Sequence, residues 1–236
     1  MKILMIHGSR QSGELFRAKL QALEKQINRA IPLQPGGVEL VYPTAPFALN
    51  PSNGTSELRN RHGSCSWFDS ESIDGLYPGL EISLESIASI LKDSGPFDGI
   101  VGFSQGAAMA AMVASLLEEN RKDAFARLED EGGMSYPACF NTLEHPPLKF
   151  VVGFSGYGAS NVAYRAFYDP GIQTPMMHFW GSMDTVVDES ASMRLVESCL
   201  EDEKKRIVVW HSGGHVVPSG KRELVAVAHF IKSNVS

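Results

Sequence analysis

The chain has 236 residues, and its 27 Asp and Glu outnumber its 21 Lys and Arg to give a formal net charge of -6. This acidic balance argues against a nucleic-acid-binding surface, which needs clustered Lys and Arg. The three cysteines are far apart and form no C-x-x-C pair, so we expect neither a disulfide framework nor a zinc site. Since no apolar run reaches the length of a membrane span, we expect a cytoplasmic protein that is not embedded in a membrane.

Short apolar runs alternate with longer helical patterns along the whole chain, which predicts an α/β fold with a mostly parallel central sheet and helices on both faces. A length of 236 residues suits a single domain spanning residues 1–236. The expected strands, about six, are 2–6, 38–42, 99–103, 149–154, 176–180 and 206–210. The expected helices are 12–30, 79–92, 105–120, 189–200 and 220–232.

Two segments interrupt this alternation. Residues 44–77 are rich in Pro, Asn, Ser and Gly yet carry several aromatic side chains, a mixture that predicts a lid-like insertion. Residues 121–147 carry many charges together with Gly132-Gly133 and Pro146-Pro147, which favours a solvent-exposed excursion.

Residues 102–106 read Gly-Phe-Ser-Gln-Gly, a G-x-S-x-G pattern between an expected strand and an expected helix. This context is typical of a nucleophile elbow, a sharp turn that exposes its serine. Because the serine backbone is strained there, the flanking glycines allow strand and helix to pack closely. The pattern makes Ser104 the candidate nucleophile. Ser155 lies in a similar stretch, but Tyr157 replaces the second glycine, so we expect Ser155 to be a loop residue near the site.

A serine hydroxyl needs a histidine base and an acid that orients the histidine, and both follow later strands of the sequence. Asp184 comes after the strand expected at 176–180, and His215 comes after the one at 206–210. Two alternatives stay open. Asp188 better suits the cap of the next helix, and His211 lies at a strand end, whereas Gly213-Gly214 provide His215 with an adaptable loop.

The oxyanion that forms on attack needs at least two hydrogen-bond donors. One is expected to be the backbone N–H of Gln105, at the start of its helix. The second is expected from the loop after the first strand, with the N–H of Ser9 as first choice and that of Arg10 as second. His7 is expected to order this loop, which lacks the G-K-[ST] ending of a nucleotide site.

These motifs together resemble the eukaryotic "family of serine hydrolases" within the α/β-hydrolase superfamily. They are the first loop at 7–13, the pentapeptide at 102–106, and the segments 181–187 and 213–218. The resemblance spans nearly the whole chain in the right order, although Ser12 stands where we would expect an asparagine. The resemblance implies an α/β-hydrolase fold and the chemistry of esterases or thioesterases. The fungal members of the family include enzymes that release acyl chains from polyketide synthases.

The expected reaction is hydrolysis of an ester or thioester through an acyl-enzyme on Ser104, with no metal or organic cofactor. The acyl group is expected to be small or carrier-bound and to lie against Phe47, Trp67, Phe68 and Tyr157. A second hypothesis is that an acyl carrier protein is a partner, with Arg59, Arg61 and His62 as its docking patch. The alternatives are a general carboxylesterase and a non-catalytic ligand-binding protein on the same scaffold.

Overall fold

The computed structural model describes residues 1–31, 37–49, 63–69, 74–202 and 205–235. Six strands form one parallel sheet in the order β2-β1-β5-β6-β7-β8, and a short antiparallel pair, β3 and β4, lies apart from it. The strands of the sheet are β1 (Lys2–Ile6), β2 (Glu39–Val41), β5 (Gly99–Phe103), β6 (Phe150–Phe154), β7 (Met176–Gly181) and β8 (Arg206–His211). The pair consists of β3 (Phe47–Ala48) and β4 (Cys65–Ser66).

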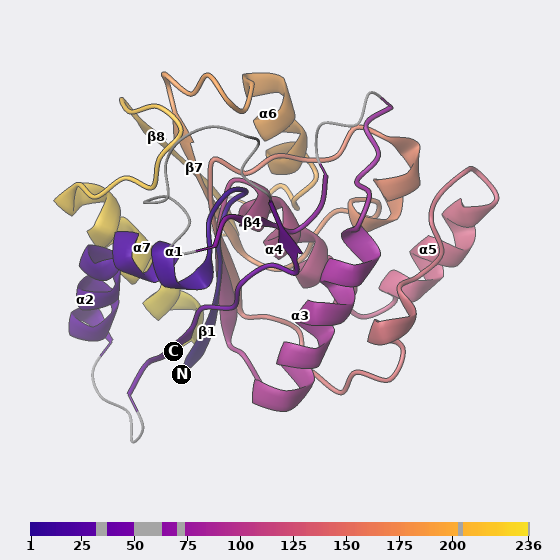
Figure 1. Cartoon of the computed structure of the whole chain (residues 1–236), viewed down its shortest axis with the longest axis horizontal. Helices are drawn as coiled ribbons and strands as arrows, with labels where there is room; N and C mark the ends of the chain where they lie inside the picture. The colour runs from indigo at the N-terminus through magenta and orange to yellow at the C-terminus, as the bar shows by residue number, and fades with distance from the viewer. Residues whose placement is uncertain (32–36, 50–62, 70–73, 203–204, 236) are drawn as a thin grey trace.

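Helices cover both faces of the sheet, as Figure 1 shows. The α-helices are α1 (Gly13–Lys19), α2 (Gln21–Ala30), α3 (Leu80–Ser94), α4 (Gln105–Leu116), α5 (Arg121–Glu129), α6 (Glu189–Glu197) and α7 (Lys221–Val235), and the 3₁₀ turns are η2 (Ala138–Phe140) and η3 (Val162–Phe167). Alternate residues of a strand point to opposite faces. In β1, Met5 therefore packs in the core beneath α1, α2 and α7, whereas Leu4 packs in the core beneath α3, α4 and α5.

The expected α/β-hydrolase architecture is therefore confirmed, with all six expected strands present. Their ends differ from the expected ones by one residue or less, because each is a nearly continuous apolar run. The four central strands β1, β5, β6 and β7 are buried almost throughout, whereas the edge strands β2 and β8 are only partly buried. The expected helix at 12–30 is two helices that meet at Leu20. None of the helices within the described ranges combines the length and the hydrophobicity that a membrane span requires.

The segment 121–147 differs from its expected role as a solvent-exposed excursion. It begins with α5, which buries Phe125 and Leu128. The Phe125 ring meets those of Tyr136 and Phe167 edge to face, with centroids 5.3 and 5.0 Å apart. The prediction missed this packed helix because most of its residues are polar, and its few apolar residues find their aromatic partners outside the helix, at Tyr136 and Phe167.

A buried ion pair ties the start of α5 to the segment before β7. The Glu118 and Arg121 side chains are 6% and 1% exposed, and Arg121 Nη2 lies 2.6 Å from Glu118 Oε2. Glu118 Oε1 accepts hydrogen bonds from the backbone N–H groups of Gln173 and Thr174, at 2.7 and 2.8 Å. Arg121 Nη1 in turn donates to the Pro170 carbonyl. The pair thus connects α4, α5 and the entry to β7.

Replacing Arg121 by methionine is expected to lower the free energy of unfolding by about 3–5 kcal/mol, because the Glu118 carboxylate would remain buried without its cation. Urea denaturation measures the change. The matched control is Arg165→Met, since Arg165 and Glu131 form a pair in which both side chains are about half exposed, and such pairs contribute about 1 kcal/mol or less. Equal losses in the two variants would contradict this account of the buried pair.

Candidate active site

Ser104 lies at the turn between β5 and α4, at the carboxyl end of the sheet. Its backbone has φ 53° and ψ -120°, a conformation that L-residues rarely adopt. The Ser104 N–H donates to the Phe154 carbonyl of the neighbouring strand β6, at 2.8 Å, which holds the strained turn in place. The residue is 9% exposed, so little of its surface is open to bulk solvent.

The two glycines of the pentapeptide are required by close backbone contacts. A Cβ on Gly102 would lie 2.3 Å from the Gly106 carbonyl oxygen, and one on Gly106 would lie 2.2 Å from the carbonyl oxygen of Ile6 in β1. Both glycines therefore allow α4 to begin directly against the sheet. The twelve residues of α4 are all buried, which its small side chains make possible.

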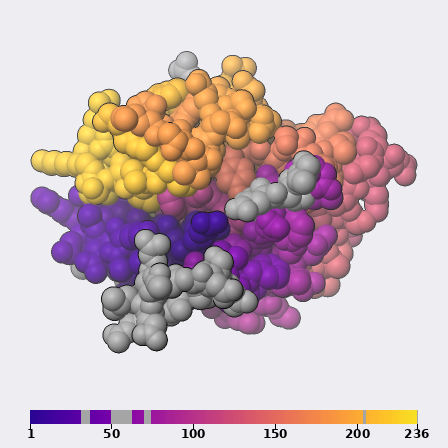
Figure 2. Space-filling model, turned by 45° about the horizontal axis from the view of Figure 1, so that its top comes forward, coloured from indigo at the N-terminus to yellow at the C-terminus, as the bar shows by residue number. Residues whose placement is uncertain are grey.

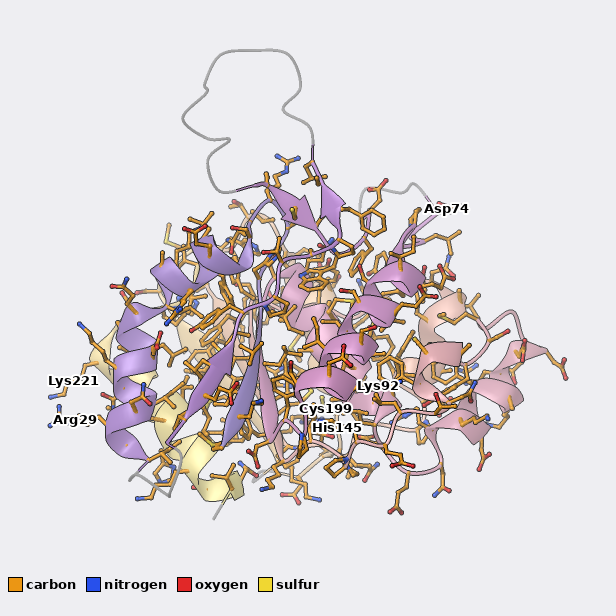
Figure 3. All side chains as sticks on the ribbon, turned by 60° about the horizontal axis from the view of Figure 1, so that its bottom comes forward. Arg29, Asp74, Lys92, His145, Cys199 and Lys221 are labelled. Carbon is orange, nitrogen blue, oxygen red and sulfur yellow. The ribbon has the colours of Figure 1, made fainter. Side chains whose placement is uncertain are left out.

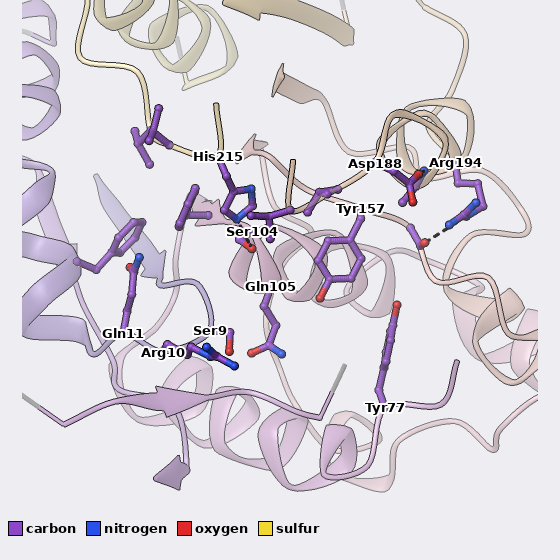
Figure 4. Close-up of a pocket in the computed structure, with 18 of the residues that line it drawn as sticks. Ser9, Arg10, Gln11, Tyr77, Ser104, Gln105, Tyr157, Asp188, Arg194 and His215 are labelled. Carbon is purple, nitrogen blue, oxygen red and sulfur yellow. Dashed lines mark hydrogen bonds between the residues drawn. The ribbon is translucent and has the colours of Figure 1, made fainter. Parts of the chain in front are cut away.

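Three side chains from distant parts of the chain meet at Ser104. His215 Nε2 lies 2.9 Å from Ser104 Oγ, and His215 Nδ1 lies 2.8 Å from Asp184 Oδ2. Asp184 follows β7 and His215 follows β8, so the parallel strands bring both to the edge where Ser104 lies. Figure 4 shows His215 directly beside Ser104. This geometry lets the imidazole accept the serine proton at Nε2 while it donates from Nδ1 to the carboxylate.

Asp184 is held as a carboxylate by its surroundings. Burial by itself raises the pKa of Asp184, but hydrogen bonds from the Val187 N–H, His215 and the Val186 N–H together lower it below its ordinary value. The two backbone N–H groups donate to Oδ1, at 3.0 and 2.9 Å, which leaves Oδ2 for the imidazole. Asp184 is therefore ionised at neutral pH and oriented before any substrate binds.

The two alternative residues have other partners. Asp188 caps α6, where its Oδ1 accepts from the Ala191 N–H at 2.8 Å. His211 Nδ1 accepts from the Gly213 N–H at 3.2 Å. Gly213 and Gly214 pack against Gly181, where a Cβ would lie 2.4 Å from each of their carbonyl oxygens. This close contact brings the loops that carry Asp184 and His215 together.

Ser155 shares the strained backbone of Ser104 without its partners. It follows β6 with φ 49° and is 1% exposed. Its Oγ is buried, and the structure gives it no hydrogen-bond partner. Ser155 thus lies one strand away from the nucleophile position with no base beside it.

Two histidines outside the site, His178 and His145, have structural surroundings. His178 is fully buried in β7, where burial lowers its pKa to about 4, and its Nε2 lies 3.6 Å from Cys199 Sγ. His145 accepts a hydrogen bond from the Phe97 N–H at 2.8 Å. Figure 3 shows His145 toward the end of the molecule opposite Asp74. Among the described residues, no cluster of three or more His, Cys, Asp or Glu side chains has the arrangement of a metal site.

The loop after β1 lies next to Ser104, as expected. Ser9, Arg10 and Gln105 all line the cavity beside Ser104. As the first residue of α4, Gln105 has a backbone N–H without an intrahelical acceptor. Arg10 has φ 61°, so the backbone turns sharply at this point of the loop. Both candidates for the second oxyanion donor are thus present at the site.

His7 orders this loop from beneath. Its Nε2 accepts from the Ala45 N–H at 3.0 Å, so the proton is on Nδ1, which donates to the Gly8 carbonyl at 2.7 Å. Burial lowers the pKa of His7 and keeps the ring neutral. The His7 carbonyl in turn accepts from Trp67 Nε1 at 2.9 Å. The ring therefore positions the donor loop and has no contact with the reacting hydroxyl.

The Gln105 side chain connects the nucleophile turn to the segment 67–68. Its Oε1 accepts from the Trp67 N–H at 2.7 Å, and its Nε2 donates to the Phe68 carbonyl at 2.8 Å. Trp67 and Phe68 are 0% and 1% exposed. They therefore belong to the core that supports the turn rather than to a surface that substrate can reach.

A cavity of about 1020 Å³ opens beside Ser104. Its walls come from both ends of the chain, which meet on the face that Figure 2 shows, with the N-terminal segment in indigo and the C-terminal segments in orange and yellow. Tyr157 lines this cavity as expected, but Phe47, Trp67 and Phe68 do not. Phe47 instead covers Gly79, where a Cβ would lie 2.6 Å from its ring. The expectation for these three was wrong because their apolar surface is used in packing.

Tyr77 and Arg194 are among the cavity-lining residues that sequence reasoning missed. Tyr77 is the last aromatic residue of the segment 44–77, so the aromatic content of that segment was the available signal. Arg194 lies on α6, and nothing in the sequence distinguishes it from other exposed helical arginines. The predicted docking patch of Arg59, Arg61 and His62 lies outside the described residues, as does half of the expected lid.

Known proteins resemble this chain over most of its length. The family model described as "Serine hydrolase (FSH1)" matches residues 1–227. A dihydrofolate reductase from Schizosaccharomyces pombe is 31% identical over 92% of the chain, which spans only 44% of that longer protein. Esterase OVCA2 from Danio rerio is 30% identical over 98% of the chain and 96% of its own length.

The fold also has solved counterparts. The crystal structure of acyl-protein thioesterase 2 from Zea mays covers 100% of this chain and 94% of its own, with a TM-score of 0.60 and 21% identity. At this identity the similarity concerns the fold, and it agrees with the parallel sheet and its helices described above.

Proposed function

This chain belongs to the serine hydrolase (FSH1) family, and on that premise we propose that it cleaves ester or thioester bonds of small or carrier-bound acyl groups through a Ser104-His215-Asp184 triad. The observation that carries the proposal is the hydrogen-bonded chain from Asp184 through His215 to Ser104, at 2.8 and 2.9 Å. The similarity to an esterase supports cleavage of an ester bond. Thioester cleavage stays a prediction, which rests on the fact that both bonds need the same triad.

The proposed reaction has two steps. Ser104 Oγ attacks the carbonyl carbon while His215 Nε2 takes the serine proton, and the imidazolium then protonates the alcohol or thiol as it leaves. Water, deprotonated by the same imidazole, attacks the acyl-enzyme and releases the acid. The charge on the carbonyl oxygen is stabilised by the Gln105 N–H and by the N–H of Ser9 or Arg10.

The finer proposal is that the acyl group is a polyketide or fatty acyl chain delivered by an acyl carrier protein. Its support is the family resemblance, together with a cavity large enough for an extended acyl group. A cytoplasmic location stays a prediction.

Matched esters and thioesters of rising acyl length test the proposed function through kcat/KM. We expect sustained turnover of both bond types, with an optimum acyl length set by the depth of the cavity. A carrier-bound thioester compared with the same free thioester tests the carrier proposal. A non-catalytic binding protein would release at most one product per chain, and that result would contradict the proposed function.

A further inference from the structure

The cavity beside Ser104 has a charge opposite to that of the whole chain. The chain carries a formal net charge of -6. Among the described residues, the cavity is lined by three cationic side chains, Arg10, Lys19 and Arg194, against one carboxylate, that of Asp188. A concave surface with a local excess of positive charge attracts anionic ligands.

One end of this cavity is built to hold a polar group. Figure 4 shows Tyr77, Tyr157 and Arg194 on one side of Ser104, with Arg10 and Gln11 on the other. The Tyr77 ring is stacked between Phe68 and Tyr164, with centroids 4.4 and 4.9 Å away. The Tyr77 N–H also donates to the Tyr164 hydroxyl at 2.6 Å. The ring is thus held rigidly, and its hydroxyl lies toward Tyr157 and the cavity.

The Tyr77 hydroxyl is available as a hydrogen-bond donor. Burial raises the pKa of Tyr77 to about 12, so the hydroxyl keeps its proton at neutral pH. A rigid aromatic ring with a protonated hydroxyl can donate to an anionic oxygen without losing side-chain entropy.

Arg194 has no competing anion in contact with its guanidinium. Its Nε and Nη1 donate to the Gly158 carbonyl and the Ser190 hydroxyl, both neutral and both at 3.4 Å. Within the part of the chain that the structure describes, Arg194 forms no ion pair. The nearby Asp188 carboxylate is engaged by the Ser190 hydroxyl and the Ala191 N–H, at 2.7 and 2.8 Å. The guanidinium therefore keeps capacity for a charged ligand.

We propose that Arg194 and the Tyr77 hydroxyl bind a free carboxylate of the substrate, so that this hydrolase prefers esters or thioesters that carry a second, unesterified carboxyl group. The inference rests on the proposed function and narrows its substrate class. Hydrolysis of such an ester adds water across the ester bond. When the acyl group carries the free carboxyl, the products are an alcohol and a dicarboxylic acid. When the alcohol carries it, the products are a simple acid and a carboxylated alcohol.

Matched substrate pairs test this inference through the ratio of kcat/KM for the carboxylated ester to that for its neutral analogue. On the acyl side, the pair is the 4-nitrophenyl half-ester of adipic acid and 4-nitrophenyl hexanoate. On the alcohol side, it is the hexanoyl ester of 4-hydroxybenzoate and that of 4-methylphenol. We expect the wild-type protein to prefer the carboxylated member of one pair, and Arg194→Met to lower that ratio about tenfold or more.

Three further variants test the contact and its specificity. Arg194→Lys keeps the charge and should retain part of the preference. Tyr77→Phe keeps the aromatic stack but loses the hydroxyl, and should lower the ratio about threefold or more. Lys19→Met removes an equal charge from the cavity lining and should change the ratio by less than about twofold. If Lys19→Met lowered the ratio as much as Arg194→Met, a specific contact with Arg194 would be overturned. The preference would then come from the overall positive charge of the cavity.

The two proposals fail in different ways. The carboxylate site alone would be overturned if the protein hydrolysed the neutral esters in a Ser104-dependent reaction but showed no preference for the carboxylated esters. The same conclusion would follow if it showed a preference that Arg194→Met left intact. A wild-type protein that turns over neither member of either pair would overturn the proposed hydrolase reaction as well.

Discussion

Ser104→Ala is expected to lower kcat about 10⁴-fold or more on any ester that the wild-type protein cleaves, and to abolish covalent labelling by a fluorophosphonate probe. The reason is that the hydroxyl 2.9 Å from His215 Nε2 is the only atom of Ser104 that can form the acyl-enzyme. Alanine removes this one atom and leaves the backbone of the turn unchanged. Gel detection of the labelled protein and steady-state ester hydrolysis measure the two effects.

Ser155→Ala is the matched control for this experiment. Ser155 also follows a central strand with a positive φ, 49°, and its hydroxyl is buried without a partner. Removal of an unpaired buried hydroxyl is near neutral or stabilising, so labelling and turnover should persist. If Ser155→Ala lost the labelling and Ser104→Ala retained it, the nucleophile would be Ser155 and not Ser104.

Asp184→Asn is expected to lower kcat about 10⁴-fold, a typical loss when the acid of such a triad becomes an amide. Oδ1 of Asp184 accepts two backbone N–H groups, so an asparagine would keep its oxygen there and turn its NH₂ toward His215. The amide would then donate to Nδ1, and the proton of the neutral ring would move to Nε2, where it blocks acceptance of the serine proton. Ester hydrolysis at neutral pH measures the loss.

Asp188→Asn separates this catalytic role from a general loss of carboxylate charge. Asp188 lies four positions beyond Asp184 and caps α6 through its side-chain oxygen, a role that asparagine performs about equally well. We expect Asp188→Asn to keep most of the activity. If it lost activity while Asp184→Asn kept more than about a tenth, Asp188 would be the acid of the triad instead.

A structural feature could be predicted from the sequence when neighbouring residues determine it, and could not when distant residues do. The strands of the sheet could be predicted within a residue, because a buried parallel strand is an apolar run that needs no knowledge of its neighbours. Helix α5 was missed because its first residue, Arg121, is buried only through Glu118 and carbonyls contributed from a later segment. Polar residues of this kind carry no sign in the sequence that they are buried.

The pocket was the least predictable part of the site. Trp67 and Phe68 looked like pocket residues because they are large and apolar, yet the Gln105 amide binds their backbone and keeps them beneath the turn. Arg194 looked like an ordinary surface residue, yet α6 places it at the cavity. Whether a side chain faces substrate or core depends on which elements pack beside it, and local sequence does not contain that information.

By itself, the sequence determined the α/β class and the candidates for the nucleophile, the acid and the base, because these follow from strand periodicity and from a turn that demands glycines at 102 and 106. Only the tertiary structure decided between Asp184 and Asp188 and between His215 and His211. Those choices depend on distances of about 3 Å between loops that are far apart in the chain. Such distances are set by the packing of β7 and β8 and by the contact of Gly181 with residues 213–214.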